Sequence, residues 1–304
     1  MPSWLPSTPY PAAKDGFWGP VTSTLNWCEE DYYASHYLAE IVNSLTNLIF
    51  VVLAFKGIAN CLRNGHDTVF VVAFVSYLLV GLGSFFFHAT LLYPMQLVDE
   101  LSMIYTTSIM TFALFTRAAA RPARLFFGLL VASLAAFITA YYVYLGDPLF
   151  HQNAFAVLTA FTILRSLYIM ETRLRPSRRC KDLSLTPAEQ ARRDVRDDVI
   201  VTTMWRFVGL ALAAAAGGFA IWNLDTLHCD AIRRWRHRVG LPWGVLLEGH
   251  GWWHILTGIS AYYQLMWGVW LRYCLNGQQD DVEMVWPSMW SVPVVEKVSA
   301  KKRN

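Results

Sequence analysis

The chain has 304 residues, of which 55% are hydrophobic and only 15% are charged, whereas soluble domains carry about 25% charged residues. This deficit of charge excludes an ordinary soluble domain and indicates that the bilayer is the main solvent. The net charge of +3 is small, and we expect no nucleic-acid partner. The N-terminal stretch MPSWLPSTPYPAAKDGFWGP is rich in proline and lacks an apolar core, so we do not expect a cleaved signal peptide there.

Seven stretches approach the length and hydrophobicity of a membrane-spanning helix, which needs about 20 mostly apolar residues. The sequence therefore predicts an all-α polytopic membrane protein with seven transmembrane helices. The predicted spans are residues 40–61, 68–88, 97–116, 124–145, 152–171, 199–222 and 250–274. They divide the chain into an N-terminal segment (1–39), a membrane domain (40–274) and a C-terminal tail (275–304).

The first predicted span is imperfect, because Glu40, Asn43 and Asn47 recur in it at helical spacing. Polar residues within such segments face the bundle interior and mark function. The alternative at each amide is a simple hydrogen bond between helices. The pattern thus points to the interior of the bundle without choosing between these roles.

Basic residues are concentrated in the first, third and fifth connections and in the tail, which ends KVSAKKRN. Cytoplasmic loops carry the excess of Lys and Arg, so this distribution predicts a lumenal N-terminus and a cytoplasmic C-terminus. One feature conflicts with that orientation, because the sixth connection falls on the lumenal side and is itself basic. It contains Arg233, Arg234, Arg236 and Arg238.

The five cysteines separate according to this orientation. Cys28 and Cys229 fall on the lumenal side, and Cys61, Cys180 and Cys274 fall at or near the cytoplasmic face. Disulfides form in oxidising compartments, so a Cys28–Cys229 bridge is the pairing that the orientation allows. The alternative is that both remain unpaired thiols.

Three of the eight histidines share features of a metal site. His250 and His254 stand at i and i+4 in GHGWWHIL, which puts both imidazoles on one helix face. His88 ends the second span, at the same predicted depth as the start of the seventh. Three histidines with an open fourth position are typical of catalytic zinc. The others fall in or beside predicted loops, where a solvated role suffices: His36, His66, His151, His228 and His237.

Two more polar residues belong to this lumenal layer. Ser84 precedes His88 by four residues, and Asp99 begins the third span. A carboxylate beside zinc can move a proton between water and a leaving amine, and a hydroxyl can hold an oxyanion. For Ser84 alone, a hydrogen bond to its own helix carbonyl is the simpler interpretation. Glu100 competes with Asp99, but helix geometry turns it to another face.

The segment NWCEEDYYASHYLAE offers hard oxygen ligands within a short stretch, at Asn26, Glu29, Asp31 and Glu40. Such a set suits calcium, which takes six to eight oxygens in flexible geometry. The spacing does not follow the EF-hand loop. Spacing alone favours the alternative, a solvated acidic turn before the first helix.

Four blocks of the sequence resemble the alkaline ceramidases, a family of seven-span intramembrane hydrolases that includes fungal dihydroceramidases and phytoceramidases. The blocks are FWGPVTSTLNWCEEDYYASHYLAEIVNSLTNL, GLGSFFFHATLLYPMQLVDELSMIY, WNLDTLHCD and GHGWWHILTGISAYY. The resemblance implies zinc on His88, His250 and His254, with Ser84 and Asp99 as catalytic residues. For Ser84 it thereby replaces the simpler interpretation.

The resemblance also implies a structural calcium ion and the lumenal Cys28–Cys229 disulfide. The calcium ligands it assigns are Asn26, Trp27 (through its backbone oxygen), Glu29, Asp31 and Glu40. The chain departs from the family pattern at two of these, since the family has Asp in place of Asn26 and Asn in place of Asp31. The exchange preserves the number of ligands and the charge, so we still expect calcium to bind.

The activity implied is hydrolysis of the N-acyl amide of ceramide, dihydroceramide or phytoceramide by a zinc-activated water, giving a sphingoid base and a free fatty acid. The implied location is the endoplasmic reticulum or Golgi membrane. The main rival is a seven-span lipid receptor of the progestin and adipokine receptor type. A retinal protein is excluded because residues 250–274 contain no lysine, and a lipid desaturase would need several paired-histidine boxes.

Overall fold

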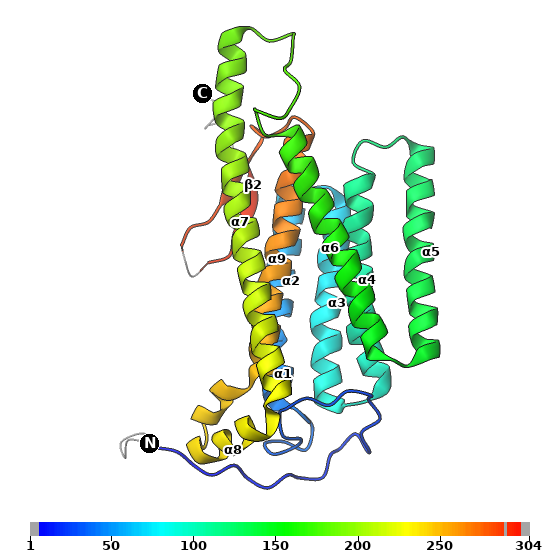
Figure 1. Ribbon diagram of the computed structural model, residues 1–304, viewed down its shortest axis with the longest axis vertical. Coiled ribbons are helices and arrows are strands. Elements are labelled where there is room, and N and C mark those ends of the chain that lie inside the picture. Colours follow the sequence, from blue (N-terminus) through cyan, green and yellow to red (C-terminus); the bar gives the residue numbers. More distant parts are fainter. Residues whose placement is uncertain (1–5, 289–290, 299–304) are drawn as a thin grey trace.

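A computed structural model describes residues 6–288 and 291–298 of the chain (Figure 1). The last residues of the predicted tail, 299–304, lie outside the described residues, as do 1–5 and 289–290. Within these ranges the regular secondary structure is almost entirely helical. The elements in chain order are α1 (Ile41–Thr46), α2 (Leu48–Asn64), α3 (Thr68–Thr90), α4 (Tyr93–Phe115), α5 (Arg121–Leu145), α6 (Pro148–Arg173), α7 (Pro187–Leu227), α8 (Cys229–Val239), the 3₁₀ helix η1 (Trp243–Leu247), α9 (Gly249–Leu275), β1 (Val282–Val285) and β2 (Val294–Lys297).

The helices agree with the predicted all-α class. Five helical segments in the described part of the chain are long and apolar enough to cross a membrane: Ile41–Asn64, Thr68–Thr90, Arg121–Leu145, Pro148–Arg173 and Pro187–Leu227. α4 and α9 occupy the other two predicted spans but are not among those five. Both carry buried polar side chains, which lower their hydropathy and hold much of the site described below.

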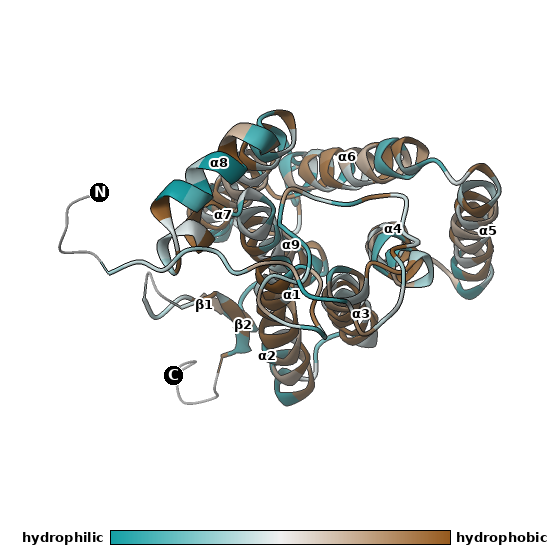
Figure 2. Cartoon of the chain, turned by 90° about the horizontal axis from the view of Figure 1, so that it is seen from below, coloured by the Kyte–Doolittle hydropathy of each residue, from teal (hydrophilic) through white to brown (hydrophobic). Residues whose placement is uncertain are grey.

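α9 lies at the centre of the bundle and α5 at its edge (Figure 2). α9 packs against α7 and α2, whereas α3 packs between α2 and α4. The main apolar core joins α2, α3, α7 and α9 through side chains such as Phe74, Met204, Tyr262 and Met266. α5 buries only Ile138 and Tyr142, so most of its apolar surface faces outward, as expected for a helix in contact with lipid.

α7 is longer than the predicted span 199–222 at both ends. Its 41 residues correspond to about 60 Å of helix, and one end projects past the neighbouring helices (Figure 1). This end begins with a capping box between Thr186 and Glu189, with Pro187 in the first turn. The charged residues of the first turns hid the start of the helix, because a search for apolar spans stops where charges accumulate.

Part of the predicted tail forms packed structure. β1 and β2 make an antiparallel pair with Val282 opposite Lys297, and Val295 is fully buried. The carbonyl of Val295 accepts a hydrogen bond from the side-chain amide of Asn60 at 3.0 Å and lies 3.0 Å from Nε2 of His66. The hairpin therefore closes the end of α2 that lies away from α1.

Candidate metal centre

Three histidines from two helices meet at one end of the bundle. His88 stands near the end of α3, and His250 and His254 stand in the first two turns of α9. All three are buried, and one nitrogen from each lies within 4.8 Å of the other two. Among the residues that the structure describes, this is the group of His, Cys, Asp or Glu side chains that converges closely enough to hold a metal ion.

The start of α9 is fixed on α7, and this fixes two of the three imidazoles. The buried carboxylate of Asp225 accepts a hydrogen bond from the backbone N–H of Gly249 at 3.3 Å. A β-carbon at Gly249 would lie 2.6 Å from that of Asp225, so only glycine allows the approach. Asp225 thus satisfies a free N–H of the first turn and positions His250 one residue later.

Two of the histidines have polar partners on the side away from the cluster. Nδ1 of His88 lies 2.5 Å from Oε2 of Glu40, and Nδ1 of His254 lies 3.0 Å from the hydroxyl of Thr46. A carboxylate accepts, so His88 carries its proton on Nδ1 and leaves the lone pair of Nε2 for a ligand bond. Metal-binding histidines are oriented by such partners. Three neutral, buried imidazoles, two of them oriented by such partners, fit zinc.

Sequence reasoning missed these partners, although part of the signal was present. Glu40 was assigned to calcium and Thr46 was not considered. The polar residues recurring at helical spacing in the first span, Glu40, Asn43 and Asn47, do face the bundle interior, since all three are fully buried. The pattern showed which face was important, but only the packing of α1 against α9 shows that it supports the histidines.

Ser84 and Asp99 lie together beside this cluster. Ser84 is buried one turn before His88, and its side chain lies near the carboxyl group of Asp99. Gly83 makes the contact possible, because a β-carbon there would lie 3.0 Å from the backbone nitrogen of Asp99. Glu100 points elsewhere, as predicted, and its carboxylate accepts hydrogen bonds from Tyr142 and Gln96.

The predicted calcium ligands make hydrogen bonds with one another and with the backbone. The Glu29 carboxylate accepts from the backbone N–H of Val42 at 2.7 Å and of Asn43 at 2.8 Å. The side chain of Asn26 donates to Asp31 at 3.0 Å. Oxygens of these residues do not form a converging set like that of the histidines within the described chain. Calcium therefore stays a prediction, whereas the three histidines predicted to bind zinc do lie together.

The comparisons with known proteins agree with this geometry. The sequence profile of a family described as Ceramidase matches residues 19–296. The chain belongs to the ceramidase family. It is 32% identical over 287 residues to alkaline ceramidase 3 of Mus musculus, and the alignment covers 92% of this chain and 96% of the relative. It is 30% identical over 297 residues to alkaline ceramidase YPC1 of Saccharomyces cerevisiae, and this alignment covers 93% of this chain and 87% of the relative.

In this ceramidase-family chain the N-terminal segment is tied to the connection between α7 and α9. The predicted Cys28–Cys229 disulfide is present, with Cα atoms 5.4 Å apart. The Cys28 carbonyl also accepts hydrogen bonds from Arg233 at 2.8 Å and from Arg236 at 2.6 Å. Arg236 is fully buried and forms an ion pair with Glu248.

These contacts account for two of the four arginines that conflict with the predicted orientation. The sixth connection is basic because Arg233 and Arg236 bind backbone carbonyls and a buried carboxylate within the protein. Loop arginines used as internal donors say little about which side of the membrane a loop occupies. The other two basic residues, Arg234 and Arg238, are exposed.

Two histidines were assigned a solvated role wrongly. His66 and His151 are buried, with 6% and 2% of their surface exposed. His151 lies inside α6, where Nε2 is 2.7 Å from the Glu100 carbonyl. His66 is held between the β2 carbonyl of Val295 and the Tyr273 hydroxyl. Both rings are buried because groups distant in sequence form hydrogen bonds with them, and the local sequence does not reveal these partners.

Proposed function

We propose that this chain is a zinc-dependent ceramidase that hydrolyses the N-acyl amide bond of ceramides, giving a sphingoid base and a free fatty acid. The observation that carries the proposal is the buried cluster of His88, His250 and His254 with the Ser84–Asp99 pair one helical turn away. Family membership supports the same reaction. The ceramide, dihydroceramide and phytoceramide forms share this amide, and all are proposed substrates.

The proposed setting is a membrane of the endoplasmic reticulum or Golgi, with seven spans, a lumenal N-terminus and a cytosolic C-terminus. Support for seven spans comes from α4 and α9, which run alongside the five helices that are apolar enough to cross a bilayer. Support for the orientation comes from the disulfide at the histidine end, because an oxidising lumen favours such a bond.

His88, His250 and His254 would hold the zinc ion. Zinc in such a site acts as a Lewis acid, which polarises a carbonyl and lowers the pKa of water to about 7. The protein contributes a dry surrounding, since all three imidazoles are buried. Glu40 keeps the His88 ring in the tautomer that presents Nε2, and Thr46 orients the ring of His254.

Asp99 and Ser84 carry the proton transfer and the charge stabilisation. The Asp99 carboxylate takes a proton from water as the water oxygen bonds to the acyl carbon. As the C–N bond breaks, Asp99 returns that proton to the leaving nitrogen. Ser84 donates its hydroxyl hydrogen to the carbonyl oxygen as negative charge develops there. In the resting arrangement the same hydroxyl lies near Asp99.

Calcium is proposed as a structural ion bound by Asn26, the Trp27 carbonyl, Glu29, Asp31 and Glu40. Two features support it. Oδ1 of Asp31 is buried without a hydrogen-bond partner. Burial, and then the neighbouring carboxylates of Glu248 and Glu40, raise the pKa of Glu29 well above its usual value. A cation would offset the repulsion among these acids.

The test is turnover by the purified, full-length protein on a panel of ceramides, measured as released fatty acid, with bound zinc counted in the same samples. Asp99→Asn is expected to retain zinc and to lose a factor of about 10²–10⁴ in kcat. Asp230→Asn, at an exposed acid on the same side, is the matched control and should keep full activity. Zinc bound without turnover of any ceramide by the unaltered protein would overturn the enzyme and favour a lipid receptor.

A further inference from the structure

A basic depression lies at the end of the bundle opposite the histidines, where α4 and α6 end and α7 begins. Its cavity has a volume of about 780 Å³, and none of its lining residues is acidic. Six arginines line it, and we use the term basic depression for the surface they form. They are Arg117, Arg165, Arg173, Arg178, Arg179 and Arg193.

Three of these arginines are paired with carboxylates that stand outside the lining. Arg179 pairs with Asp194 and Asp197. Arg178 approaches Glu171 at 3.8 Å, and Arg193 approaches Asp182 at 3.3 Å. These pairs account for part of the positive charge and hold the loop before α7 against the depression.

The other three have no acidic partner among the residues that the structure describes. Arg165 lies over the rings of Phe115 and Tyr168, 5.7 Å and 5.4 Å from their centroids. Arg173 is exposed at the end of α6. Arg117 donates to the Leu275 carbonyl at 2.7 Å and to the side chain of Asn276. Three cations without counter-charges therefore surround one cavity.

Arg117 shows the cost of this arrangement. Partial burial, and then the positive charges of Arg272 and Arg173, lower the pKa of Arg117. Like charges within a few ångströms repel one another. A bound anion would remove the repulsion, and guanidinium groups match the oxygens of a phosphate particularly well.

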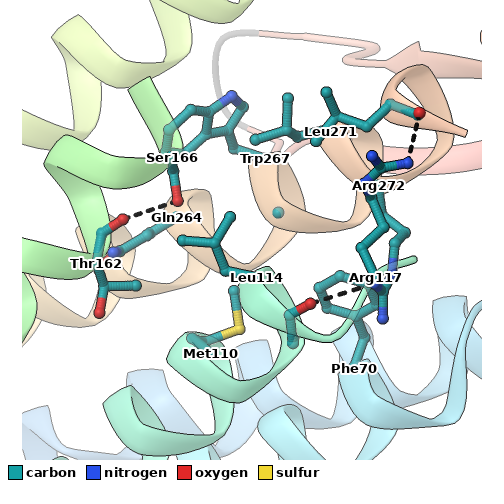
Figure 3. Close-up of a pocket in the computed structure, with 13 residues that line it drawn as sticks. Phe70, Met110, Leu114, Arg117, Thr162, Ser166, Gln264, Trp267, Leu271 and Arg272 are labelled. Carbon is teal, nitrogen blue, oxygen red and sulfur yellow. Dashed lines mark hydrogen bonds between the residues drawn. The ribbon is translucent and has the colours of Figure 1, made fainter. Parts of the chain in front are cut away.

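The depression adjoins an apolar pocket and a lipid-facing surface. The pocket shares Leu114, Arg117 and Leu275 with it. Figure 3 shows Arg117 and Arg272 at one end of this pocket, next to Phe70 and Leu114, with Trp267 and Leu271 along its wall. On α6, large apolar side chains flanking Arg165 are exposed: Phe161, Leu164 and Tyr168.

We propose that the basic depression binds the phosphate headgroup of an anionic phospholipid. A phosphate ion or a soluble phosphate ester offers the same charge, but the apolar pocket and the exposed face of α6 favour a ligand with acyl chains. Basic pockets between membrane helices on the cytoplasmic side recognise such headgroups. The proposed orientation of the chain makes this face cytosolic. Phosphate oxygens accept from the three unpaired arginines, and the acyl chains lie along α6.

The experiment measures binding to the purified full-length chain in detergent, so its result is independent of ceramide turnover. The probe is fluorescent phosphatidylinositol 4-phosphate, with the matching phosphatidylcholine as the neutral lipid and inositol 1,4-bisphosphate as the soluble headgroup. We expect the double variant Arg165→Gln/Arg173→Gln to bind the anionic lipid roughly 25-fold more weakly, about fivefold per charge. The single variant Arg173→Glu changes an exposed residue without an ion pair, so its fold should be intact and its binding weakened.

The matched control is Arg121→Gln/Arg124→Gln, which removes two exposed charges from the same end without touching the depression. Its affinity should stay within about twofold of the unaltered chain, since these arginines lie outside the site. An equal loss of affinity in the control would overturn the proposed site and would show that the lipid is attracted by the overall surface charge of this end. Equal affinity for inositol bisphosphate would overturn the lipid assignment, as would equal binding of phosphatidylcholine.

Discussion

Two arginines at opposite ends of the bundle, Arg236 and Arg173, have opposite surroundings. At the histidine end, Arg236 is fully buried, pairs with Glu248 and donates to the Cys28 carbonyl. At the other end, Arg173 is exposed and has no acidic partner within the described residues. The buried arginine donates its hydrogen bonds to groups within the protein and cannot reach a ligand, whereas the exposed one remains able to attract an anion. Position, more than residue type, separates a structural arginine from a binding one.

This difference sets the energies at stake. Removing one member of a buried ion pair leaves an uncompensated charge and costs about 3–5 kcal/mol. An exposed ion pair contributes about 0–1 kcal/mol. Substitution of the buried Arg236 should therefore affect stability and metal binding, while substitution of an exposed arginine such as Arg173 should affect ligand binding with little effect on stability.

Arg236→Ala is expected to have the largest effect on stability. It leaves Glu248 buried without its cation and removes one of the two arginine donors to the Cys28 carbonyl, so the loss should be about 3–5 kcal/mol, with loss of bound zinc. Thermal unfolding and zinc content measure both. The control Arg234→Ala alters an exposed arginine on the same helix. Equal stability of the two variants would contradict the comparison.

Cys229→Ser should come next, because it opens a bridge between residues 201 positions apart. Bridges of long loops stabilise by about 2–5 kcal/mol. The melting temperature should fall in the variant, and reductant should lower that of the unaltered protein but not that of the variant. Cys180→Ser, at an exposed free cysteine of the opposite end, is the control. A melting temperature unaffected by reductant would argue against this role.

Thr46→Val tests the support of His254 with little change in volume. It removes the hydroxyl 3.0 Å from Nδ1, and loss of such an outer partner lowers metal affinity by about 10–100-fold. Zinc affinity is measured by competition with a chelator. Thr226→Val, at an exposed threonine that bonds only to its own helix, should bind zinc as the unaltered chain does. The side chain of Asn47 lies 3.3 Å from the same nitrogen. If Asn47 alone were enough to orient His254, the two variants would bind zinc with equal affinity.

Arg193→Gln should have the smallest effect. It removes a pair with Asp182 in which both side chains are partly exposed and a looser contact, at 3.8 Å, with the buried Asp197, which keeps Arg179 as its partner. The free energy of unfolding should therefore change by less than about 1 kcal/mol. The melting temperature should stay close to that of the unaltered chain. A loss as large as that of Arg236→Ala would show that this exposed pair stabilises the fold as much as the buried one, and would remove the contrast between exposed and buried arginines.

The sequence was informative where local pattern decides the structure. Apolar length predicted the helices, and the i, i+4 spacing of His250 and His254 predicted a shared face. Placing His88 beside them required the orientation of the spans. The Ser84–Asp99 pair was expected only from the family resemblance, and the structure brings the two side chains together through the close approach at Gly83. Their catalytic roles stay a prediction.

Contacts between segments distant in sequence account for what was missed. The partners of His88 and His254 come from Glu40 and Thr46, and no spacing rule links residues about 50 or 200 positions apart. The burial of His151 depends on a carbonyl of α4. The packed hairpin of β1 and β2 was missed because two four-residue strands give too short an alternation to recognise beside apolar helices.

α9 carries residues of both ends on one rigid rod. His254 and Arg272 are 18 residues apart on the same helix, a rise of about 27 Å, and the rod is buried between them at Tyr262 and Met266. If α9 pivots at this buried middle, its two ends shift in opposite directions. A displacement of the Arg272 end would then move the imidazoles at the other end in the opposite direction. In such a motion the helix would turn as one body about its buried middle.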